Sequence, residues 1–193
     1  MNAVSALRRF VREKPPAVER CELCAAPVGP RHEHVVDPAR HELKCACTAC
    51  ALLFPDGACL LRVRPRAELL ADFHLSDTQW DALRLPIGLA FFLRTVSRVT
   101  AFYPGPAGAT ESLVSLEAWE EIARLNALEL QPDVEALLVN RVGAAREHYL
   151  VSVDQCYRLV GILRRSWRGF SGGEEVWERI GQFFSELKGG ARA

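Results

Sequence analysis

The chain has 193 residues, of which 49% are hydrophobic and 25% are charged. These values match a globular protein with a real core and exclude a disordered or fibrous chain. Because 24 lysine and arginine residues balance 24 aspartate and glutamate residues, no overall field attracts the chain to nucleic acid or to an anionic membrane, and any partner must be recognised locally.

Residues 1–20 predict a short basic helical arm that ends at Pro15. Val4, Leu7 and Val11 lie on one face of this helix. The arm lacks the long apolar stretch of a signal peptide, and no later stretch is long enough to span a membrane. We therefore expect a cytoplasmic protein, and in that reducing compartment seven cysteines indicate metal ligands or buried thiols rather than disulfides.

Residues 21–63 predict a zinc-ribbon-like metal module, because this segment contains six of the seven cysteines. Two Cys-x-x-Cys turns about twenty residues apart have the spacing of a zinc ribbon, in which four sulfurs complete a tetrahedral site. The predicted ligands are Cys21, Cys24, Cys47 and Cys50. With all four positions taken by sulfur, no position is left for water or substrate, so the pattern favours a structural metal over a catalytic one.

The four-thiol set leaves the identity of the metal open. Tetrahedral sulfur suits both zinc and iron, so a rubredoxin-like electron-transfer site is the alternative to a zinc site. Rubredoxin-like turns normally have a glycine directly after the second cysteine, where Ala25 and Ala51 stand in this chain. This difference favours zinc. A segment with so few large apolar residues needs a metal to fold, and structural zinc contributes on the order of 10–16 kcal/mol of apparent binding free energy.

The other cysteines and the histidines of this segment are weaker candidates for ligands. Cys45 lies outside both Cys-x-x-Cys turns, and we expect this spare thiol to lie near the metal without binding it. Cys59 is expected to be a small buried residue. His32 and His34 are closer together than the histidines of a zinc finger. Like His41, they are expected to be solvated loop residues.

Residues 64–193 predict an α+β domain that follows a basic, proline-containing linker. Ser76 and Gln79 have the spacing of a capping box, which predicts a short helix. The runs IGLAFFLR and RVTAFY then predict a β-hairpin whose first strand is central, and VEALLVNR with EHYLVSV predicts a second hairpin. Two hairpins indicate an antiparallel sheet of about four strands.

Three longer helices are predicted from apolar positions at helical spacing. The first spans residues 115–126, the second follows Asp154 as its N-cap and ends at Gly169, and the third ends before Gly189. We expect the helices to pack on one face of the sheet.

The segment YPGPAGATES, residues 103–112, predicts a glycine-rich loop between a strand and a helix. It lacks the Gly-Lys-Ser/Thr ending of a nucleotide-binding loop. A rigid connection is the simpler interpretation, with docking of a small ligand or a partner at Tyr103 to Ser112 as the alternative.

Two further groups of residues have simple structural interpretations. Cys156 with His148 and Asp154 contains the residue types of a thiol protease, but Cys156 falls on the apolar face of its helix, which predicts a buried, inert thiol. The arginines of residues 62–66 lie beside the metal module. Without an aromatic and basic stripe they do not predict binding to nucleic acid.

Several segments, taken in order, resemble an uncharacterised family of actinobacterial proteins: CELC, CACTACALLF, IGLAFF, AFYPGPAGATES, PDVEALLVNR and DQCYRLVGILRRSWRGFSGGEEVW. The resemblance covers nearly the whole chain beyond the arm. Genes of that family tend to lie near those of nickel–iron hydrogenases, so the resemblance implies an accessory or assembly protein, or a redox partner. The family has no assigned catalytic residues, and none is carried over.

From these observations we expect a non-catalytic accessory or adaptor protein, stabilised by zinc, that binds a hydrogenase subunit or a maturation factor. The alternative is a rubredoxin-like iron protein that transfers electrons to a hydrogenase. Neither nucleic acid nor a membrane is an expected partner.

Overall fold

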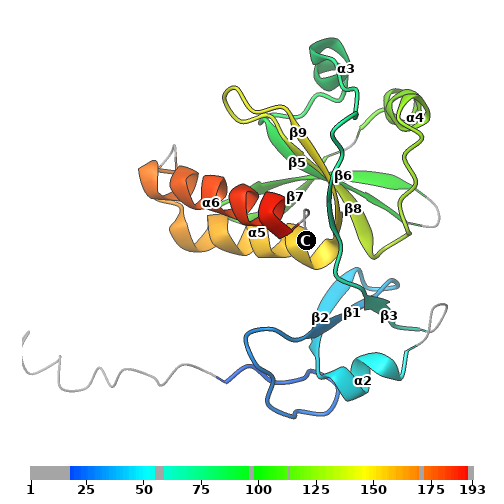
Figure 1. Ribbon diagram of the computed structural model, residues 1–193, viewed down its shortest axis with the longest axis vertical. Coiled ribbons are helices and arrows are strands. Elements are labelled where there is room, and N and C mark those ends of the chain that lie inside the picture. Colours follow the sequence, from blue (N-terminus) through cyan, green and yellow to red (C-terminus); the bar gives the residue numbers. More distant parts are fainter. Residues whose placement is uncertain (1–17, 55–58, 96–97, 113, 170–171, 191–193) are drawn as a thin grey trace, which may run out of the picture.

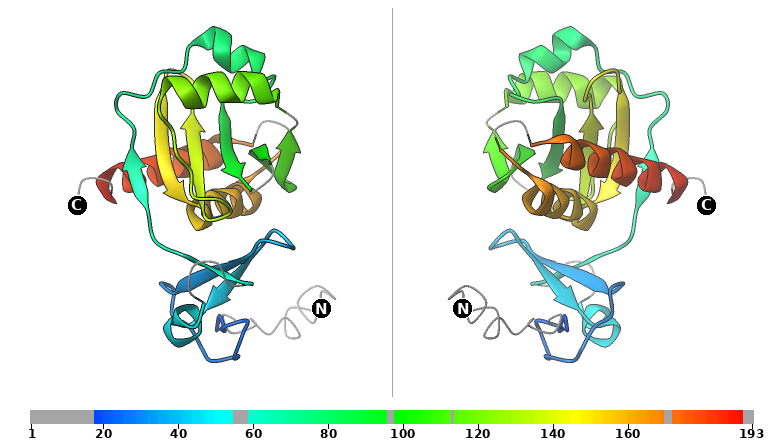
Figure 2. Two further views of the ribbon diagram at one scale, coloured as in Figure 1. Left: turned by 90° about the vertical axis from the view of Figure 1, so that its right-hand side faces the viewer. Right: turned by 90° about the vertical axis from the view of Figure 1, so that its left-hand side faces the viewer.

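The computed structural model describes residues 18–54, 59–95, 98–112, 114–169 and 172–190. Most of the predicted N-terminal arm, residues 1–17, lies outside the described residues. The chain forms a small module and a larger domain, which residues 64–66 connect (Figure 1, Figure 2). No helix in the described ranges is long and apolar enough to cross a membrane.

The small module is built on a three-stranded antiparallel sheet with the order β2-β1-β3. Its elements are β1 (Glu33–Asp37), β2 (Glu42–Ala46), the short helix α2 (Thr48–Leu52) and β3 (Leu61–Val63). The buried core of the module consists of Cys21, Val35, Ala46 and Ala51. Since these side chains are small, apolar burial alone contributes little to the stability of the module.

A six-stranded antiparallel sheet with the order β4-β9-β8-β5-β6-β7 forms the larger domain. Its strands are β4 (Ala67–Leu69), β5 (Leu89–Arg94), β6 (Val99–Gly105), β7 (Gly108–Ser112), β8 (Glu135–Asn140) and β9 (Glu147–Ser152). Both predicted hairpins are present, as β5 with β6 and as β8 with β9. The prediction that β5 is a central strand is confirmed, since it pairs with β8 on one side and with β6 on the other.

The prediction of about four strands was wrong, because the sheet has a further strand at each edge. β4 has only three residues, too few for an alternating pattern to identify it. Residues 103–112, predicted to form a loop, instead continue β6 and form β7, with the turn between Gly105 and Gly108. Pro104 lies beyond Phe102, the last residue of β6 that pairs with β5, so its missing N–H removes no hydrogen bond to that strand.

Helices cover both faces of the larger sheet, so the prediction of helices on a single face was also wrong. These helices are α3 (Asp77–Ala82), α4 (Leu116–Leu125), α5 (Val153–Ser166) and α6 (Glu174–Gly190). α5 and α6 pack on one face, and α3 and α4 pack on the other (Figure 1). Consecutive residues of β5 show the reason. Phe91 belongs to the core cluster under α5 and α6, and Phe92 belongs to the core cluster under α3 and α4. A strand that is apolar on both faces needs a covering layer on each.

Capping residues set the starts of the helices. The side chain of Ser76 accepts a hydrogen bond from the N–H of Gln79, whose side chain accepts one from the N–H of Ser76, so the predicted capping box is confirmed. Asp154, predicted to be an N-cap, instead lies in the first turn of α5, and Ser152 occupies the N-cap position. A carboxylate in the first turn still interacts favourably with the helix dipole.

The small module and the larger domain share part of their hydrophobic core. Val36 of β1 and Val63 of β3 belong to the core cluster that includes residues of α5 and α6. Next to this contact, Nδ1 of His34 lies 3.7 Å from Oδ2 of Asp154. The module therefore rests against the beginning of α5.

Candidate metal centre

The four cysteines predicted as ligands, Cys21, Cys24, Cys47 and Cys50, lie together in the small module. Their Sγ atoms are all within 4.8 Å of one another, and those of Cys24 and Cys47 are 3.7 Å apart. Two sulfurs bound to one tetrahedral Zn²⁺ at about 2.3 Å are about 3.8 Å apart, whereas the sulfurs of a disulfide are about 2 Å apart. The cluster therefore has the dimensions of a four-thiolate metal site and could hold a metal ion.

Backbone hydrogen bonds close the first Cys-x-x-Cys turn. The N–H of Ala25 donates to the carbonyl oxygen of Cys21 at 2.8 Å. The N–H of Cys21 donates to the carbonyl oxygen of Ala26, also at 2.8 Å. Glu22 ties the turn to β2, since its N–H donates to the carbonyl oxygen of Cys45 at 2.9 Å and its carboxylate accepts from the N–H of Cys45 at 2.8 Å. Protein contacts alone thus hold the first turn against the strand that leads to the second.

The second Cys-x-x-Cys turn begins helix α2. Cys47 is the N-cap residue of this helix, and its sulfur accepts a hydrogen bond from the N–H of Cys50 at 3.5 Å. Such N–H groups stabilise a thiolate. At Cys21 hydrogen bonds from backbone N–H groups, that of Cys47 foremost, lower the thiol pKa to about 6, although burial acts in the opposite direction.

The close approach of the four thiols opposes their joint ionisation. The neighbouring side chains, first that of Cys24 and then that of Cys47, raise the pKa of Cys50 to about 12. Thiolates this close repel one another, whereas a divalent cation would compensate their charges and release the remaining protons. The electrostatics of the cluster therefore favour a bound metal ion.

Cys45 lies in a different cluster. It pairs with His34 across β2 and β1, and its sulfur lies within 4.8 Å of ring nitrogens of His32 and His34. Both histidines are partly buried, so the prediction of solvated loop residues was wrong for them. A His-x-His pattern at the start of a strand, where extended backbone places both rings on one side, is the signal that could have found them. Cys59, predicted to be buried, is exposed.

Cys156 and His148 do not form a protease-like pair. Cys156 is fully buried in the core beneath α5 and α6, and burial raises its thiol pKa well above the usual range. The prediction of a buried thiol is therefore confirmed, and a thiol with a raised pKa forms little of the reactive thiolate. His148 instead stacks on Phe73, with ring centroids 4.8 Å apart, and Phe73 packs against the core on the opposite face of the sheet.

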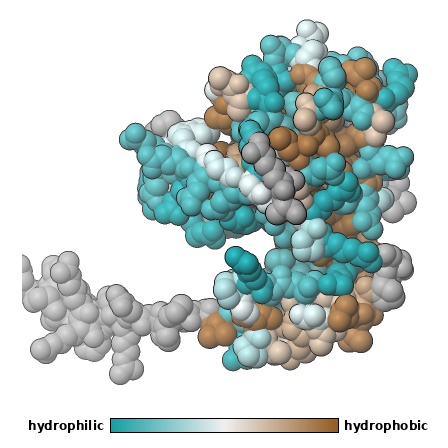
Figure 3. Space-filling model, viewed as in Figure 1, coloured by the Kyte–Doolittle hydropathy of each residue, from teal (hydrophilic) through white to brown (hydrophobic). Residues whose placement is uncertain are grey.

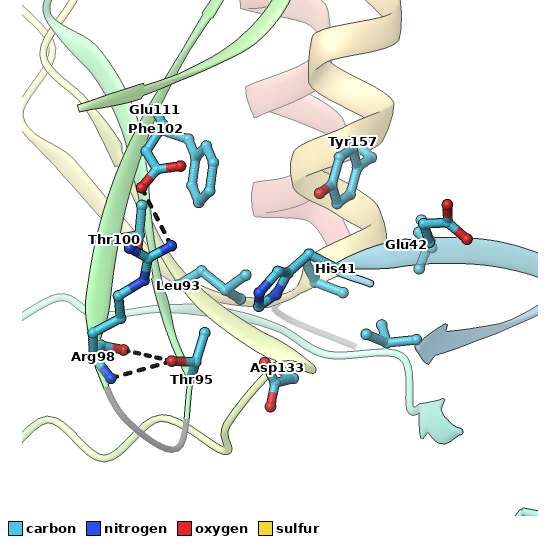
Figure 4. A pocket seen from close by; sticks show the side chains of 13 residues that line it. His41, Glu42, Leu93, Thr95, Arg98, Thr100, Phe102, Glu111, Asp133 and Tyr157 are labelled. Atoms are coloured by element: carbon cyan, nitrogen blue, oxygen red, sulfur yellow. Dashed lines mark hydrogen bonds and ion pairs between the residues drawn. The ribbon is translucent and has the colours of Figure 1, made fainter. Parts of the chain in front are cut away.

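A cavity of about 180 Å³ lies where the turn between β1 and β2 meets the larger sheet (Figure 4). Its lining is largely apolar and includes Tyr157 of α5. Arg98 forms an ion pair with Glu111 at 3.4 Å and exchanges hydrogen bonds with Thr95. Burial raises the pKa of Asp133 on the same wall. The interactions drawn in Figure 4 are those of a packed junction, and they do not pair a nucleophile with a base.

Arginines of the linker region form ion pairs within the protein. Arg62 contacts Glu33 at 3.1 Å, and Arg66 contacts Glu68 and Glu135 at 2.8 Å each. These pairs connect the small sheet, the linker and the larger sheet. Arg62 and Arg66, two of the arginines beside the metal module, are therefore paired with carboxylates of this protein.

The region that contains the four cysteines and both sheets matches one known family. No curated protein and no solved structure shows significant similarity to this chain. Residues 20–191 match a family of unknown function, DUF5947. The match includes both Cys-x-x-Cys turns and all the strands and helices of the larger domain in the described residues. The chain therefore belongs to the DUF5947 family of proteins of unknown function.

Proposed function

We propose that this protein is a non-catalytic accessory protein that binds another protein and whose small module is stabilised by a structural Zn²⁺. The observation that carries the proposal is the cluster of four thiols, Cys21, Cys24, Cys47 and Cys50, at the spacing of ligands of one ion. Four thiolates complete a tetrahedral coordination sphere and leave no position for water or substrate. Such an ion supports the fold and takes no part in a reaction.

The small hydrophobic core of the module supports a structural role for the metal. Its buried side chains are a cysteine, a valine and two alanines, which remove little apolar surface from water. Binding of structural zinc contributes on the order of 10–16 kcal/mol of apparent free energy, which appears as folding free energy. We therefore infer that the module folds fully only when it is loaded.

Exposed apolar side chains on the small module support a protein partner. Leu52 and Leu53, at the end of α2, are 62% and 72% exposed, and Val18 before the first turn is 64% exposed. Leu23, between the cysteines of the first turn, is also exposed. Figure 3 shows apolar surface on this part of the molecule. Exposed apolar side chains offer contact area to a partner, so we propose that the partner contacts the module at Leu52 and Leu53.

The identity of the partner is proposed from the resemblance to actinobacterial proteins encoded near nickel–iron hydrogenases. A hydrogenase subunit or a maturation factor is the partner that this resemblance supports. We further propose a cytoplasmic location, because a reducing compartment keeps four thiols available for a metal.

Affinity purification of the tagged chain from its own cells tests the partner. The wild-type chain should enrich a hydrogenase subunit or maturation factor, and Leu53→Asp should reduce this enrichment by at least about tenfold, which corresponds to about 1.4 kcal/mol. Leu125→Asp is the matched control, because Leu125 is 60% exposed on α4 of the larger domain. If the wild-type chain never enriches a hydrogenase component, the proposed partner is wrong. Equal binding by both variants would exclude Leu53 as part of the contact surface.

A rubredoxin-like iron protein is the second candidate. The exposure of Cys24 favours it, because electron transfer requires a site near the surface. Ala25 adopts the left-handed conformation that a glycine would favour. Ala51 argues against the iron candidate, since it lies inside helix α2 and does not adopt that conformation. Aerobically purified protein that is colourless and contains zinc would eliminate the iron candidate. Red protein with visible absorption that responds to reduction would overturn the zinc proposal.

A further inference from the structure

A second group of metal-ligand side chains lies in the small module, outside the four-thiol cluster. It consists of His32, His34 and Cys45, whose ligand atoms are all within 4.8 Å of one another. We propose that these three residues bind a second divalent transition-metal ion of the Zn²⁺ class. This second site is independent of the zinc assigned to the four thiols.

Strand pairing brings His34 and Cys45 together on the small sheet, and His32 lies directly before β1, close to both. His34 of β1 and Cys45 of β2 are partners in the antiparallel register, so their side chains are direct cross-strand neighbours. His32 precedes His34 by two residues, so extended backbone places the two side chains on the same side, and their ring centroids are 4.7 Å apart. Nitrogen and sulfur ligands of one zinc ion are about 3.3–3.6 Å apart. A side-chain shift of about 1 Å therefore closes the site around an ion.

The ring of His32 is already oriented as in a metal-binding histidine. Its Nδ1 lies 2.8 Å from the carbonyl oxygen of Gly29, so this nitrogen carries the proton and donates it to the oxygen. Nε2 then has a free lone pair, and it is buried without a hydrogen-bond partner in a side chain that is only 9% exposed. A buried acceptor without a partner is costly. A metal ion at Nε2 would satisfy it.

Asp154 provides a similar outer partner for His34. Its Oδ2 lies 3.7 Å from Nδ1 of His34, and its Oδ1 is buried without a hydrogen-bond partner. In metal sites a carboxylate beside the second ring nitrogen orients the imidazole and makes it a stronger ligand. Because Asp154 belongs to α5 and His34 to β1, an ion bound here would connect the small module to the larger domain.

The donor atoms determine the class of metal. Two imidazole nitrogens and one thiolate suit Zn²⁺ and related ions, and they do not suit Mg²⁺ or Ca²⁺, which prefer oxygen. Three protein ligands also leave one tetrahedral position for water or another small ligand. In this respect the second site differs from the four-thiol site, where sulfur fills all positions.

Zinc content per chain, measured after saturation and dialysis, tests the proposal. Cys45→Ser and His32→Gln should each lose one zinc ion per chain relative to wild type, with an unchanged far-ultraviolet circular dichroism spectrum. Cys59→Ser and His74→Gln are the matched controls, because both residues are exposed and lie outside both clusters, and they should keep the wild-type zinc content. Wild-type zinc content in both Cys45→Ser and His32→Gln would overturn the proposal.

Two further measurements keep the second site distinct from the first. X-ray absorption of the zinc-loaded wild-type chain should show imidazole as well as sulfur ligands, and sulfur alone would overturn the proposal even if the variants failed to fold. Cys24→Ser removes a ligand of the four-thiol site alone. Zinc lost in Cys24→Ser but kept in both His32→Gln and Cys45→Ser would refute the second site and leave the structural zinc standing. The reverse pattern would refute the structural zinc and support the second site.

Discussion

The sulfur atoms of Cys24 and Cys47 lie 3.7 Å apart, although 23 positions separate the two residues in the chain. This distance matches the edge of a tetrahedron of thiolates around one zinc ion, about 3.8 Å. Hydrogen bonds between Glu22 and Cys45 hold the two turns together through protein contacts. These hydrogen bonds align the two turns, and the ion is needed both to compensate the charge of four thiolates and to complete the folding of the module.

Loss of a single thiol from the cluster should remove the ion of the four-thiol site. Cys24→Ser and Cys47→Ser are expected to lose that ion and to unfold the small module, because its folding is coupled to metal binding. The Cys156→Ser variant should keep the ion of the four-thiol site. It should destabilise the larger domain by about 1–3 kcal/mol, since the substitution places a hydroxyl in an apolar core. Metal content and urea denaturation measure both effects. Retention of full metal content by Cys24→Ser would contradict the assignment of this cysteine as a ligand.

Ala25→Gly should stabilise the small module. Ala25 has a φ of 61°, a left-handed conformation that costs a residue with a Cβ about 1–2 kcal/mol and costs glycine almost nothing. Glycine also makes the unfolded chain more flexible, which lowers the free energy of unfolding. The net increase in the free energy of unfolding is expected to be about 0.5–1 kcal/mol. Resistance of the metal-loaded module to a competing chelator, together with urea denaturation, measures the gain.

The neighbouring residue provides the control for this substitution. The φ of Ala26 is not positive, so Ala26→Gly brings only the entropic penalty and should destabilise the module by about 0.5–1 kcal/mol. The same loss in both variants would show that the first turn does not impose a left-handed conformation on Ala25.

Features that depend on a few neighbouring residues could be predicted from the sequence. The two Cys-x-x-Cys turns are short-range patterns, and so is the capping box of Ser76 and Gln79, which the structure confirms. The central strand β5 was also predictable, because an uninterrupted apolar run indicates burial on both sides. The same run should have predicted helices on both faces of the sheet. Only the position of the covering layers, which depends on tertiary packing, required the structure.

Features that depend on a distant partner could not be predicted. β4 becomes a strand because Leu69 pairs with Tyr149, about eighty positions further along the printed sequence. The group of His32, His34 and Cys45 depends on the register between β1 and β2, and a shift of one residue would turn Cys45 to the other face. The spacing of residues along the chain does not determine that register.

Gly88→Ala should strongly destabilise the larger domain. A Cβ at this position would lie 2.5 Å from the carbonyl oxygen of Arg141, and the N–H of Arg141 donates to the carbonyl oxygen of Gly88 at 2.6 Å. Both groups belong to the backbone, so no side chain can move to make room, and a loss of about 2 kcal/mol or more is expected. Gly181→Ala is the control, because the site in α6 is exposed and open and alanine favours a helix by about 0.5–1 kcal/mol. Equal unfolding free energies for the two variants in urea would show that β5 and β8 do not approach each other in this way.

His148 should make the larger domain less stable in mild acid. Burial, aided by the charge of Arg141, lowers the pKa of His148 to about 4, whereas an unfolded chain titrates near about 6.5. As the pH falls from about 6.5 to about 4, His148 becomes protonated in the unfolded chain but stays neutral in the folded chain. The stability contributed by neutral His148 is therefore complete above about pH 6.5 and is lost progressively down to about pH 4, by up to about 3 kcal/mol.

His148→Phe isolates this contribution, because phenylalanine preserves the stacking on Phe73 and does not titrate. Acid also releases metal from thiolates, but this effect is common to both proteins and cancels when their unfolding free energies are subtracted. The wild-type chain should lose more stability than the variant between about pH 7 and about pH 4.5. Parallel pH profiles would show that His148 is protonated in the folded state without penalty, and hence that its ring is not buried against Phe73.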